Sequence, residues 1–539
     1  MTDIADHLRE ELRACRERAT GDAGILFPAG THEVWPDRLD ERYCFISNND
    51  DGLKRILLDG DGLEDVVIDG NGAALELHGR TTVAVVLRNS RNVTLRNFSI
   101  DWPSPSLSQA EIAGVGDGWA DVRFGSEYEV ELRDEKLVFL RDDSESSFLH
   151  NMLEFDPKRR ETAYKRFDNH GLAQTYRAEK RREGVLRIHG AFRSPPEPGN
   201  VFVFKHEPRL APGFVLDNCE NIRLENVDVY HAGGMGIVAQ CCRDIVLDHF
   251  NICCRPGSSR LFSAHADASH FVDCSGRIEL NDCLFENQMD DPCNIHGIFW
   301  RVRRRRDRCR VELEEVHHQQ RGIDTIRAGD RVAFHDSHTL KCLFETNAVS
   351  LNRFNSAVAE LATMDPLPDL PWQRVVVMRK EQEVDVLIRG CTFRRNRARG
   401  LLISSLGRVR IEKNYFHVPG AALRVSGDAY DWFESGPVED VAVNGNVFDN
   451  CNYGVWGEAL FDIVPEIANA DRGVPFHRNI RVVDNEIRRF HKPTLFAHSV
   501  DGLKVGGNRI AASDAYPASG SDRAEAVLGE GVPHADVDL

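Results

Sequence analysis

Three aspartates in one short stretch of the chain could carry out acid–base chemistry. The stretch covers residues 265–297 and contains Asp267, Asp290 and Asp291. Asp267 and Asp290 are 23 residues apart, and a strand-like run at 277–280 lies between them. If 23 residues make one turn of a stacked solenoid, the two aspartates occupy equivalent places on neighbouring turns. Because stacked strands lie about 4.8 Å apart, these side chains would then share one surface pocket.

Carboxyl groups placed in this way could cleave a glycosidic bond. One carboxylic acid protonates the departing oxygen, and a carboxylate on the opposite face of the sugar ring activates water or attacks directly. The adjacent pair Asp290-Asp291 could also share a proton or hold a water, because close like charges raise each other's proton affinity. Direct stacking favours a separation near 5 Å, whereas inverting enzymes need about 6.5 to 9.5 Å. The sequence leaves this separation open.

Other polar residues gather around these aspartates and could bind a substrate. His265 precedes Asp267, and amide and imidazole side chains flank the Asp290-Asp291 pair. Most aspartates in a β-solenoid simply form turns, so this concentration of polar residues is what favours a catalytic interpretation. Buried histidines and solvated arginines are the structural alternatives for the binding candidates. Those candidates are His231, His265, Gln288, Asn294, His296, Arg397 and Arg399.

The elements that must position these residues are short strands of a repeat. From residue 25 onward, runs of four to six residues with alternating apolar side chains end in Asn, Asp or Gly, as at 92–100, 221–227 and 479–485. Ile222 and Ile245 are 23 residues apart, and the same spacing returns in the runs 385–413 and 479–508. This period is typical of a parallel β-helix, whose bore takes the alternate apolar side chains and whose turns take Asn and Gly in left-handed backbone. A leucine-rich repeat would show Leu at fixed places, and an antiparallel sandwich would show irregular turn spacing.

We therefore predict an all-β fold: a right-handed parallel β-helix with two inserted small β (barrel-like) domains and an N-terminal capping helix. Residues 2–19 have apolar side chains at helical spacing, and a helix there could cover the open end of the solenoid. The predicted divisions are 1–104 (cap helix and first coils), 105–212 (first inserted β domain), 213–297 (central coils with the carboxylates), 298–382 (second inserted β domain), 383–511 (C-terminal coils) and 512–539 (disordered tail).

The charge balance limits the partners of the chain. Asp and Glu outnumber Lys and Arg by 85 to 67, which gives a formal net charge of −18. Nucleic acids and anionic membranes need a basic surface, so neither is an expected partner. A polyanionic substrate such as pectate also fits poorly, whereas a neutral sugar is compatible. The sequence leaves open whether copies of the chain form a homo-oligomer.

The 14 cysteines and the N-terminus bear on compartment and metal content. Many cysteines lie beside strand-like runs, so we predict buried free thiols rather than a disulfide framework. No Cys-x-x-Cys pair has a partner at zinc spacing, so no metal is expected. The N-terminus has no apolar signal region, and no apolar run is long enough to span a membrane. The expectation is a cytoplasmic protein for the chain as written, and a secreted one if its start is truncated.

Several segments resemble glycoside hydrolase family 110, the α-1,3-galactosidases that release terminal galactose from blood-group-B-type and related glycans. The residues that carry the resemblance are 265–268, 287–291 and 294–297, and 43–48, 51–55, 230–236 and 396–402 extend it over about 24–510. Pro292 and Cys293 depart from the family pattern, in which small residues such as Ala and Thr are expected.

This resemblance implies an inverting, exo-acting α-1,3-galactosidase with no required metal or other cofactor. Asp267 would be the general acid, and Asp290 with Asp291 would hold and deprotonate the water. The partner would be a galactose-terminated oligosaccharide or glycoconjugate, with or without a fucosylated branch. Two alternatives remain: another β-helix carbohydrate enzyme of the polygalacturonase or polysaccharide lyase type, with basic residues lining its cleft, and a glycan-binding β-helix without catalysis.

Overall fold

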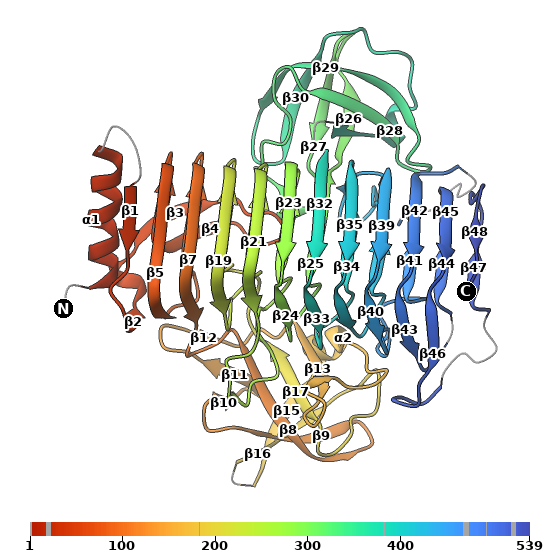
Figure 1. The fold of residues 1–539 in the computed structure, drawn as a ribbon. Helices are drawn as coiled ribbons and strands as arrows, with labels where there is room; N and C mark the ends of the chain where they lie inside the picture. Colours follow the sequence, from red (N-terminus) through yellow and green to blue (C-terminus); the bar gives the residue numbers. More distant parts are fainter. Residues whose placement is uncertain are drawn as a thin grey trace.

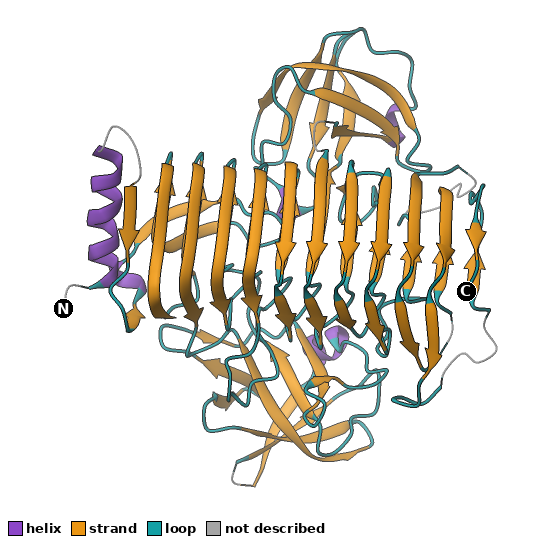
Figure 2. Cartoon of the chain, viewed as in Figure 1, coloured by secondary structure: helices purple, strands orange, loops and turns teal. Residues whose placement is uncertain are grey.

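Two long sheets of mostly parallel strands run along the molecule and form a β-helix. The computed structural model describes residues 3–17, 23–182, 184–380, 383–466, 474–491, 493–518 and 524–539. One sheet has 19 strands and the other has 13, and Figures 1 and 2 show the strands stacked from one end of the molecule to the other. The apolar side chains of both sheets meet in one continuous core between them. The predicted parallel β-helix is confirmed.

Along the chain, one or two consecutive strands belong to one sheet before the chain passes to the other. The larger sheet contains β1 (Ala23–Leu26), β2 (Thr31–Val34), β5 (Glu64–Leu77), β7 (Arg91–Asp101), β19 (Glu220–Val229), β21 (Arg243–Ile252), β23 (Ser275–Asn281), β24 (Leu284–Glu286), β32 (Val384–Arg389), β33 (Thr392–Arg394), β35 (Arg408–Glu412), β36 (Tyr415–His417), β39 (Asp440–Asn444), β40 (Val447–Asp449), β42 (His477–Val483), β43 (Glu486–Arg489), β45 (Val500–Gly506), β46 (Arg509–Ala512) and β48 (Asp536–Val537). The smaller sheet contains β3 (Asp40–Cys44), β4 (Gly52–Asp61), β6 (Thr82–Arg88), β18 (Phe214–Asp217), β20 (Ile237–Gln240), β22 (Ser269–Val272), β25 (Cys293–Ile298), β34 (Leu401–Ser404), β37 (Leu423–Val425), β38 (Glu434–Ser435), β41 (Phe461–Ile463), β44 (Leu495–Ala497) and β47 (Ala526–Leu528).

The 23-residue period is the register of the stacked coils. Ile222 on β19 lies directly opposite Ile245 on β21, and both side chains are fully buried. The same step joins β32 to β35 and β42 to β45. Several coil corners carry Asn in left-handed backbone, for example Asn92 and Asn221 with φ near 55° and 53°. Asn tolerates this conformation better than most residues, which is why it ends so many repeats.

Helix α1 (Ile4–Glu17) closes the N-terminal end of the solenoid. Leu8 and Leu12 are buried in the same core as the first coils, as the helical spacing predicts. The carboxylate of Asp3 accepts a hydrogen bond from the N–H of Ala5 at 2.8 Å and so caps the helix. Residues 2, 18 and 19 of the predicted helix lie outside the described residues.

The first interruption of the repeat forms antiparallel sheets with a core of their own. A seven-stranded sheet has the order β14 (Glu161–Thr162), β13 (Asn151–Asp156), β17 (Val201–Lys205), β8 (Leu107–Gly116), β9 (Trp119–Phe124), β16 (Val185–His189) and β15 (Arg177–Arg182). A smaller sheet contains β10 (Glu129–Arg133), β11 (Lys136–Leu140) and β12 (Glu145–Ser146), and α2 (His170–Thr175) lies between β14 and β15 in the chain. In Figure 1 this insert lies below the β-helix.

The second interruption forms a closed barrel. Its strands pair in the order β26 (Trp300–Arg305), β27 (Arg310–Glu314), β30 (Val358–Thr363), β29 (Cys342–Arg353), β28 (Arg331–Asp336) and β31 (Val375–Arg379). Apolar residues fill its interior, and in Figure 1 it lies above the β-helix. A barrel of this kind removes the exposed strand edges that a small open sheet would have.

The C-terminal tail differs from the sequence prediction. Residues 512–539 were expected to be disordered, but β47 pairs in parallel with β44, and β48 pairs with β45. That prediction is wrong for these residues, because Val532, Val537 and Leu539 pack against the end of the core and cover its last coil. Residues 519–523 of the predicted tail lie outside the described residues.

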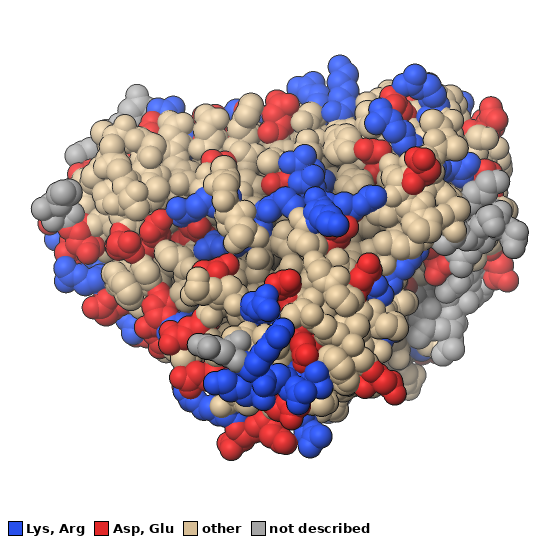
Figure 3. Space-filling view, turned by 90° about the horizontal axis from the view of Figure 1, so that it is seen from below, with Lys and Arg blue, Asp and Glu red and all other residues tan. Residues whose placement is uncertain are grey.

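The surface and the cysteines agree with the composition. Seen from below, basic and acidic side chains are interspersed, so this face carries no extended basic field (Figure 3). No disulfide joins the cysteines in the described part of the chain, and most of the 14 are buried, as predicted. No helix in the described part of the chain has the length and apolarity needed to cross a membrane.

Buried asparagines on neighbouring coils form a ladder of side-chain hydrogen bonds that stabilises the fold. The side-chain oxygen of Asn446 accepts hydrogen bonds from the N–H and the amide of Asn414, at 2.9 and 3.0 Å. Asn446→Ala would leave these buried donors short of a partner, so we expect the free energy of unfolding to fall by about 2 kcal/mol. Urea denaturation would measure the change. The exposed neighbour Asn444 is the matched control, and Asn444→Ala should change stability by less than about 0.5 kcal/mol; equal effects would contradict the role of the ladder.

Candidate active site

The three predicted catalytic aspartates line one cavity of about 290 Å³ on the outer face of the smaller sheet. Asp267 precedes β22, and Asp290 with Asp291 precedes β25. None of the three faces the apolar bore, and each is at most 8% exposed. Three carboxyl groups in one buried place cannot all be ionised cheaply, so the cations around them decide where the protons are.

The register of the two strands corrects one detail of the sequence prediction. Ser269 faces Cys293, a step of 24 residues (293 minus 269). The residue after Asp267 donates its N–H to the carbonyl of Asp291 at 3.0 Å, which continues the same register. Asp291 is therefore level with Asp267. The predicted equivalence of Asp267 and Asp290 is wrong, because this coil is one residue longer than the 23-residue coils.

Asp290 is held as a carboxylate between two arginines. Its Oδ2 accepts from Arg209 and its Oδ1 accepts from Arg397, both at 2.8 Å. Burial alone would raise the pKa of Asp290, but the positive charges of Arg397 and Arg209 outweigh it and hold the pKa below its ordinary value. Arg397 also pairs with the buried Asp168 at 2.9 Å. Asp290 is thus a fixed negative charge and a weak base.

Asp291 has one cation instead of two. Arg399 donates its main-chain N–H to Oδ1 at 2.8 Å and its guanidinium lies 3.0 Å from Oδ2. Burial raises the pKa of Asp291 to about 6, with Arg399 opposing this and the charges of Asp290 and Asp267 adding to it. A carboxylate with this proton affinity can accept a proton near neutral pH.

Asp267 lacks a salt bridge to an arginine among the described residues. Its Oδ2 lies 2.7 Å from Nδ1 of His270. Burial and then the negative charge of Asp290 raise the pKa of Asp267 to about 7. Asp267 is consequently the group of the three that retains a proton most readily, which is the property of a general acid.

Only some of the predicted binding residues line this cavity. Asn294, Arg397 and Arg399 do, and Asn294 donates to Glu434. Four others do not line the cavity and are at most 2% exposed: His231, His265, Gln288 and His296.

Physical reasons for the positions of these residues are visible in their contacts. His231 bonds to the carbonyl of Ser263 at 2.6 Å and accepts from the N–H of Ser106 at 3.0 Å. His265 bonds to the hydroxyl of the same Ser106. These histidines anchor the first insert to the coils. The sequence shows that these side chains are polar, but it does not show whether they face the cavity or the contact between the insert and the coils.

Several cavity residues were missed by the sequence analysis. His150, His170 and Lys205 come from the first insert, and Trp432 and Glu434 come from the segment around β38. Burial lowers the pKa of Lys205 to about 7, with Arg209 and Arg397 adding to the effect. The sequence offers one weak indication of these residues, which is that Lys205 ends an otherwise apolar strand. Both segments lie outside the repeat, so the period could not align them with the aspartates.

One cluster in the described residues has the composition of a metal site. His270, His296 and Glu434 each place a ligand atom within 4.8 Å of the others. The two Nε2 atoms lie 2.9 Å apart, which is a hydrogen-bond distance, and Glu434 accepts from Asn48 at 3.0 Å and from Asn294. Each of these groups therefore has a protein partner already.

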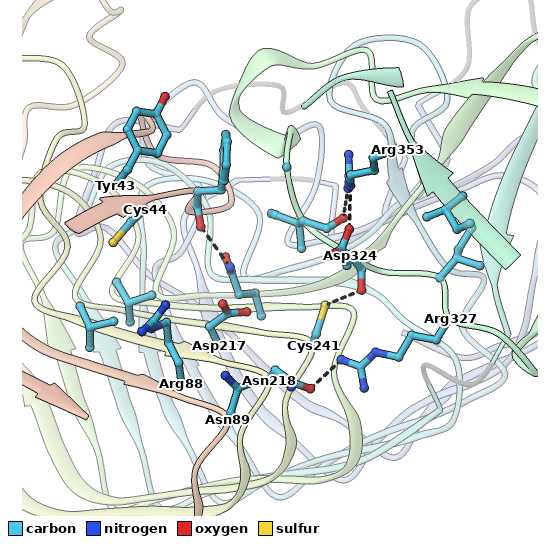
Figure 4. Close-up of a pocket in the computed structure, with 18 of the residues that line it drawn as sticks. Tyr43, Cys44, Arg88, Asn89, Asp217, Asn218, Cys241, Asp324, Arg327 and Arg353 are labelled. Carbon is cyan, nitrogen blue, oxygen red and sulfur yellow. Dashed lines mark hydrogen bonds and ion pairs between the residues drawn. The ribbon is translucent and has the colours of Figure 1, made fainter. Parts of the chain in front are cut away.

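A second and larger cavity, of about 790 Å³, lies between the first coils and the second insert. Figure 4 shows its polar residues, with Arg353 turned toward Asp324 and Arg327 toward Asn218. Two carboxylates line it, Asp217 and Asp324, and the side chain of Asp324 is 73% exposed. This cavity lacks the closely placed buried carboxyl groups that acid–base catalysis needs, so the smaller cavity is the candidate active site.

Known proteins resemble this chain over nearly its whole length. The sequence model named GLAA-B beta-barrel domain I matches residues 108–202, within the first insert. Alpha-1,3-galactosidase A of Shewanella woodyi is 34% identical over 519 residues, which are 96% of this chain and 84% of that protein. Alpha-1,3-galactosidase B of Bacteroides thetaiotaomicron is 30% identical over 528 residues, covering 94% and 83%. Alpha-1,3-galactosidase A of Bacteroides fragilis is 30% identical over 513 residues, covering 93% and 84%.

Proposed function

Because this chain belongs to the α-1,3-galactosidases, glycoside hydrolase family 110, we propose that it hydrolyses terminal α-1,3-linked galactose from blood-group-B-type glycans and from linear α-1,3-galactosyl glycans. The observation that carries the proposal is the set of three buried carboxyl groups in one cavity, with pKa values of about 7 for Asp267 and about 6 for Asp291. Two carboxyl groups whose proton affinities differ in this way can serve as acid and base in one reaction.

The size of the cavity supports action at the end of a glycan. At about 290 Å³ it lies at the lower limit of ordinary small-ligand sites. A space of this size suits a single sugar ring better than the interior of a polysaccharide. Trp432 forms part of the wall and remains partly exposed, so its ring could stack on the apolar face of galactose.

The carboxyl groups divide the chemistry by their surroundings. Asp267 gives its proton to the departing glycosidic oxygen. The Oδ1 side of its carboxyl group has no hydrogen-bond partner in the described part of the chain, so this side is open to the substrate. Asp291 accepts the proton of the attacking water. Asp290 stays ionised and stabilises the positive charge that develops on the sugar ring.

Direct attack by water would invert the anomeric configuration. Asp290 has both oxygens occupied by arginines and is a poor nucleophile, and Asp291 is oriented by Arg399. Both features favour activation of water over a covalent glycosyl intermediate, and the product would then be β-galactose.

The runner-up function, cleavage of a uronate, requires free cations in the cavity. Arg209, Arg397 and Arg399 are present but are each paired with an aspartate. Burial also favours the neutral form of Lys205. The positive charges are therefore already neutralised by aspartates of the protein, and a carboxylated sugar would gain little from them.

The test of the proposed function is product analysis by proton NMR. The chain is incubated with galactose-α-1,3-galactose and, separately, with its fucosylated counterpart, and the anomeric signals are followed from the first minutes. We expect galactose from both substrates, with the β-anomer appearing first. Uronate cleavage without galactose release, or saturable binding without product, would contradict the proposal.

Replacement of the acid gives a sharper test of the assigned roles. Asp267→Asn should lower kcat on a natural disaccharide by about 10²-fold or more. It should cost much less on an aryl galactoside with an acidic leaving group, because such a group departs without protonation. Asp282, an exposed aspartate in a left-handed turn of the next coil, is the matched control, and Asp282→Asn should retain activity. Near-normal turnover by the Asp267 variant would remove the role assigned to Asp267.

A further inference from the structure

A chain of short hydrogen bonds runs away from the cavity behind Asp267. The Oδ2 of Asp267 lies 2.7 Å from Nδ1 of His270, and Nε2 of His270 lies 2.9 Å from Nε2 of His296. The chain ends where Nδ1 of His296 lies 2.8 Å from the carbonyl oxygen of Gly297. Both imidazole side chains are fully shielded from solvent. The protein thus encloses two histidines directly behind its proposed acid.

The last link of this chain fixes the direction of all the others. A carbonyl oxygen can only accept, so Nδ1 of His296 must carry a proton. In a neutral imidazole the other nitrogen then has a lone pair, so Nε2 of His296 must accept a proton from Nε2 of His270. That in turn leaves Nδ1 of His270 as an acceptor. The remaining partner, Oδ2 of Asp267, must supply a proton.

Burial keeps both imidazoles neutral, with one ring nitrogen protonated and the other able to accept a hydrogen bond. It lowers the pKa of His270 to about 4 and lowers the pKa of His296 below its ordinary value. Glu434 opposes this effect from β38, and its Oε1 lies 3.5 Å from Nε2 of His296 without a hydrogen bond between them. The carboxylate of Glu434 accepts instead from Asn48 and Asn294.

We propose that His270 and His296 are positioning residues whose fixed hydrogen-bond direction keeps the catalytic proton on Asp267. The proposal rests on the proposed function, because it concerns the acid of that reaction. The proton rests on Oδ2 beside His270 and moves only in the catalytic step. The carboxyl group turns about its Cβ–Cγ bond and gives the proton to the glycosidic oxygen as the C–O bond breaks, and the resulting carboxylate takes another from solvent after the product leaves.

The other charged groups around the acid do not impose this direction. Asp290, Asp291 and Glu434 raise the proton affinity of Asp267 by their negative charge, and Arg209 and Arg399 lower it. These charges act through space and are indifferent to which way a hydrogen bond points. The histidine chain is therefore a separate contribution that a change of polarity can test.

The experiment reverses the polarity of the chain at either of two positions. In His270→Asn an amide can turn its N–H toward Asp267, which His270 cannot do while Nδ1 is unprotonated. In His296→Gln the amide can donate to Nε2 of His270, so that His270 takes the other tautomer and donates to Asp267. Each change favours the ionised form of Asp267 and should lower its pKa.

The readout is the pH profile of kcat/KM. Asp267 must be protonated to act, so activity falls as the pH rises through its pKa, and a lower pKa moves this alkaline limb to lower pH. On a disaccharide we expect both variants to shift the limb down by about one pH unit, with about a tenfold loss at pH 7.5. On an aryl galactoside with an acidic leaving group the loss should be within about twofold.

The control and the contrary results are distinct. His335 is a buried histidine of the barrel whose Nδ1 bonds to the carbonyl of Leu340, and His335→Asn should leave the limb unmoved. An unmoved alkaline limb in folded His270 and His296 variants would overturn the inference. An equal loss of activity on both substrates would also overturn it, because that is the result expected if the histidines act only in packing. His296→Gln keeps the test open if His270→Asn does not fold. Failure of the proposed function would differ, because the wild-type chain would release no galactose.

Discussion

The candidate site depends on how few cations are shared among three buried carboxyl groups. Among the described residues, Asp290 pairs with two arginines and Asp291 with one, whereas Asp267 bonds to an imidazole and to no arginine. Like charges in a buried space compete for ionisation, so the carboxyl group with the most cations ionises first and the one with the fewest keeps its proton. This unequal distribution turns three chemically identical side chains into a fixed charge, a base and an acid.

The β-helix makes that distribution possible because it places distant segments at one level. Coils that stack in register bring the loops before β22, β25 and β34 together, which delivers Asp267, the Asp290-Asp291 pair and the two arginines Arg397 and Arg399. The first insert adds Lys205 and the histidines of its loops from the side. A rigid scaffold thus carries the charges, and an insert encloses them.

The sequence predicted the scaffold well because its constraint is local and repeated. Alternation of apolar residues and left-handed corners must recur in every coil, as in the pair Ile222 and Ile245. The three aspartates followed from the same period, apart from a shift of one residue. The sequence could not predict the cavity residues that come from segments outside the repeat. Glu434 belongs to β38, and Lys205 belongs to the first insert.

The predicted binding histidines show that residue type alone does not determine which side chains line the cavity. His231, His265 and His296 have the right residue type near the right aspartates, yet each is enclosed by main-chain and hydroxyl partners behind the cavity wall. Residue type indicates which side chains can do chemistry, but direction depends on packing. For His296 this hidden position is what gives it influence, because a buried carbonyl fixes its tautomer.

The central claim is that Asp267 holds its proton more tightly than Asp291, and Asp291 more tightly than Asp290. Carbon-13 NMR of the aspartate carboxyl carbons as a function of pH measures this order directly. Each signal is assigned by replacing one aspartate at a time and noting which signal disappears. We expect a carboxyl carbon titrating near pH 7 that is lost when Asp267 is replaced, and another near pH 6 that is lost when Asp291 is replaced. The Asp290 carboxyl should stay ionised to lower pH than an ordinary aspartate. An Asp267 carboxyl that titrates below pH 5, or below that of Asp291, would contradict it.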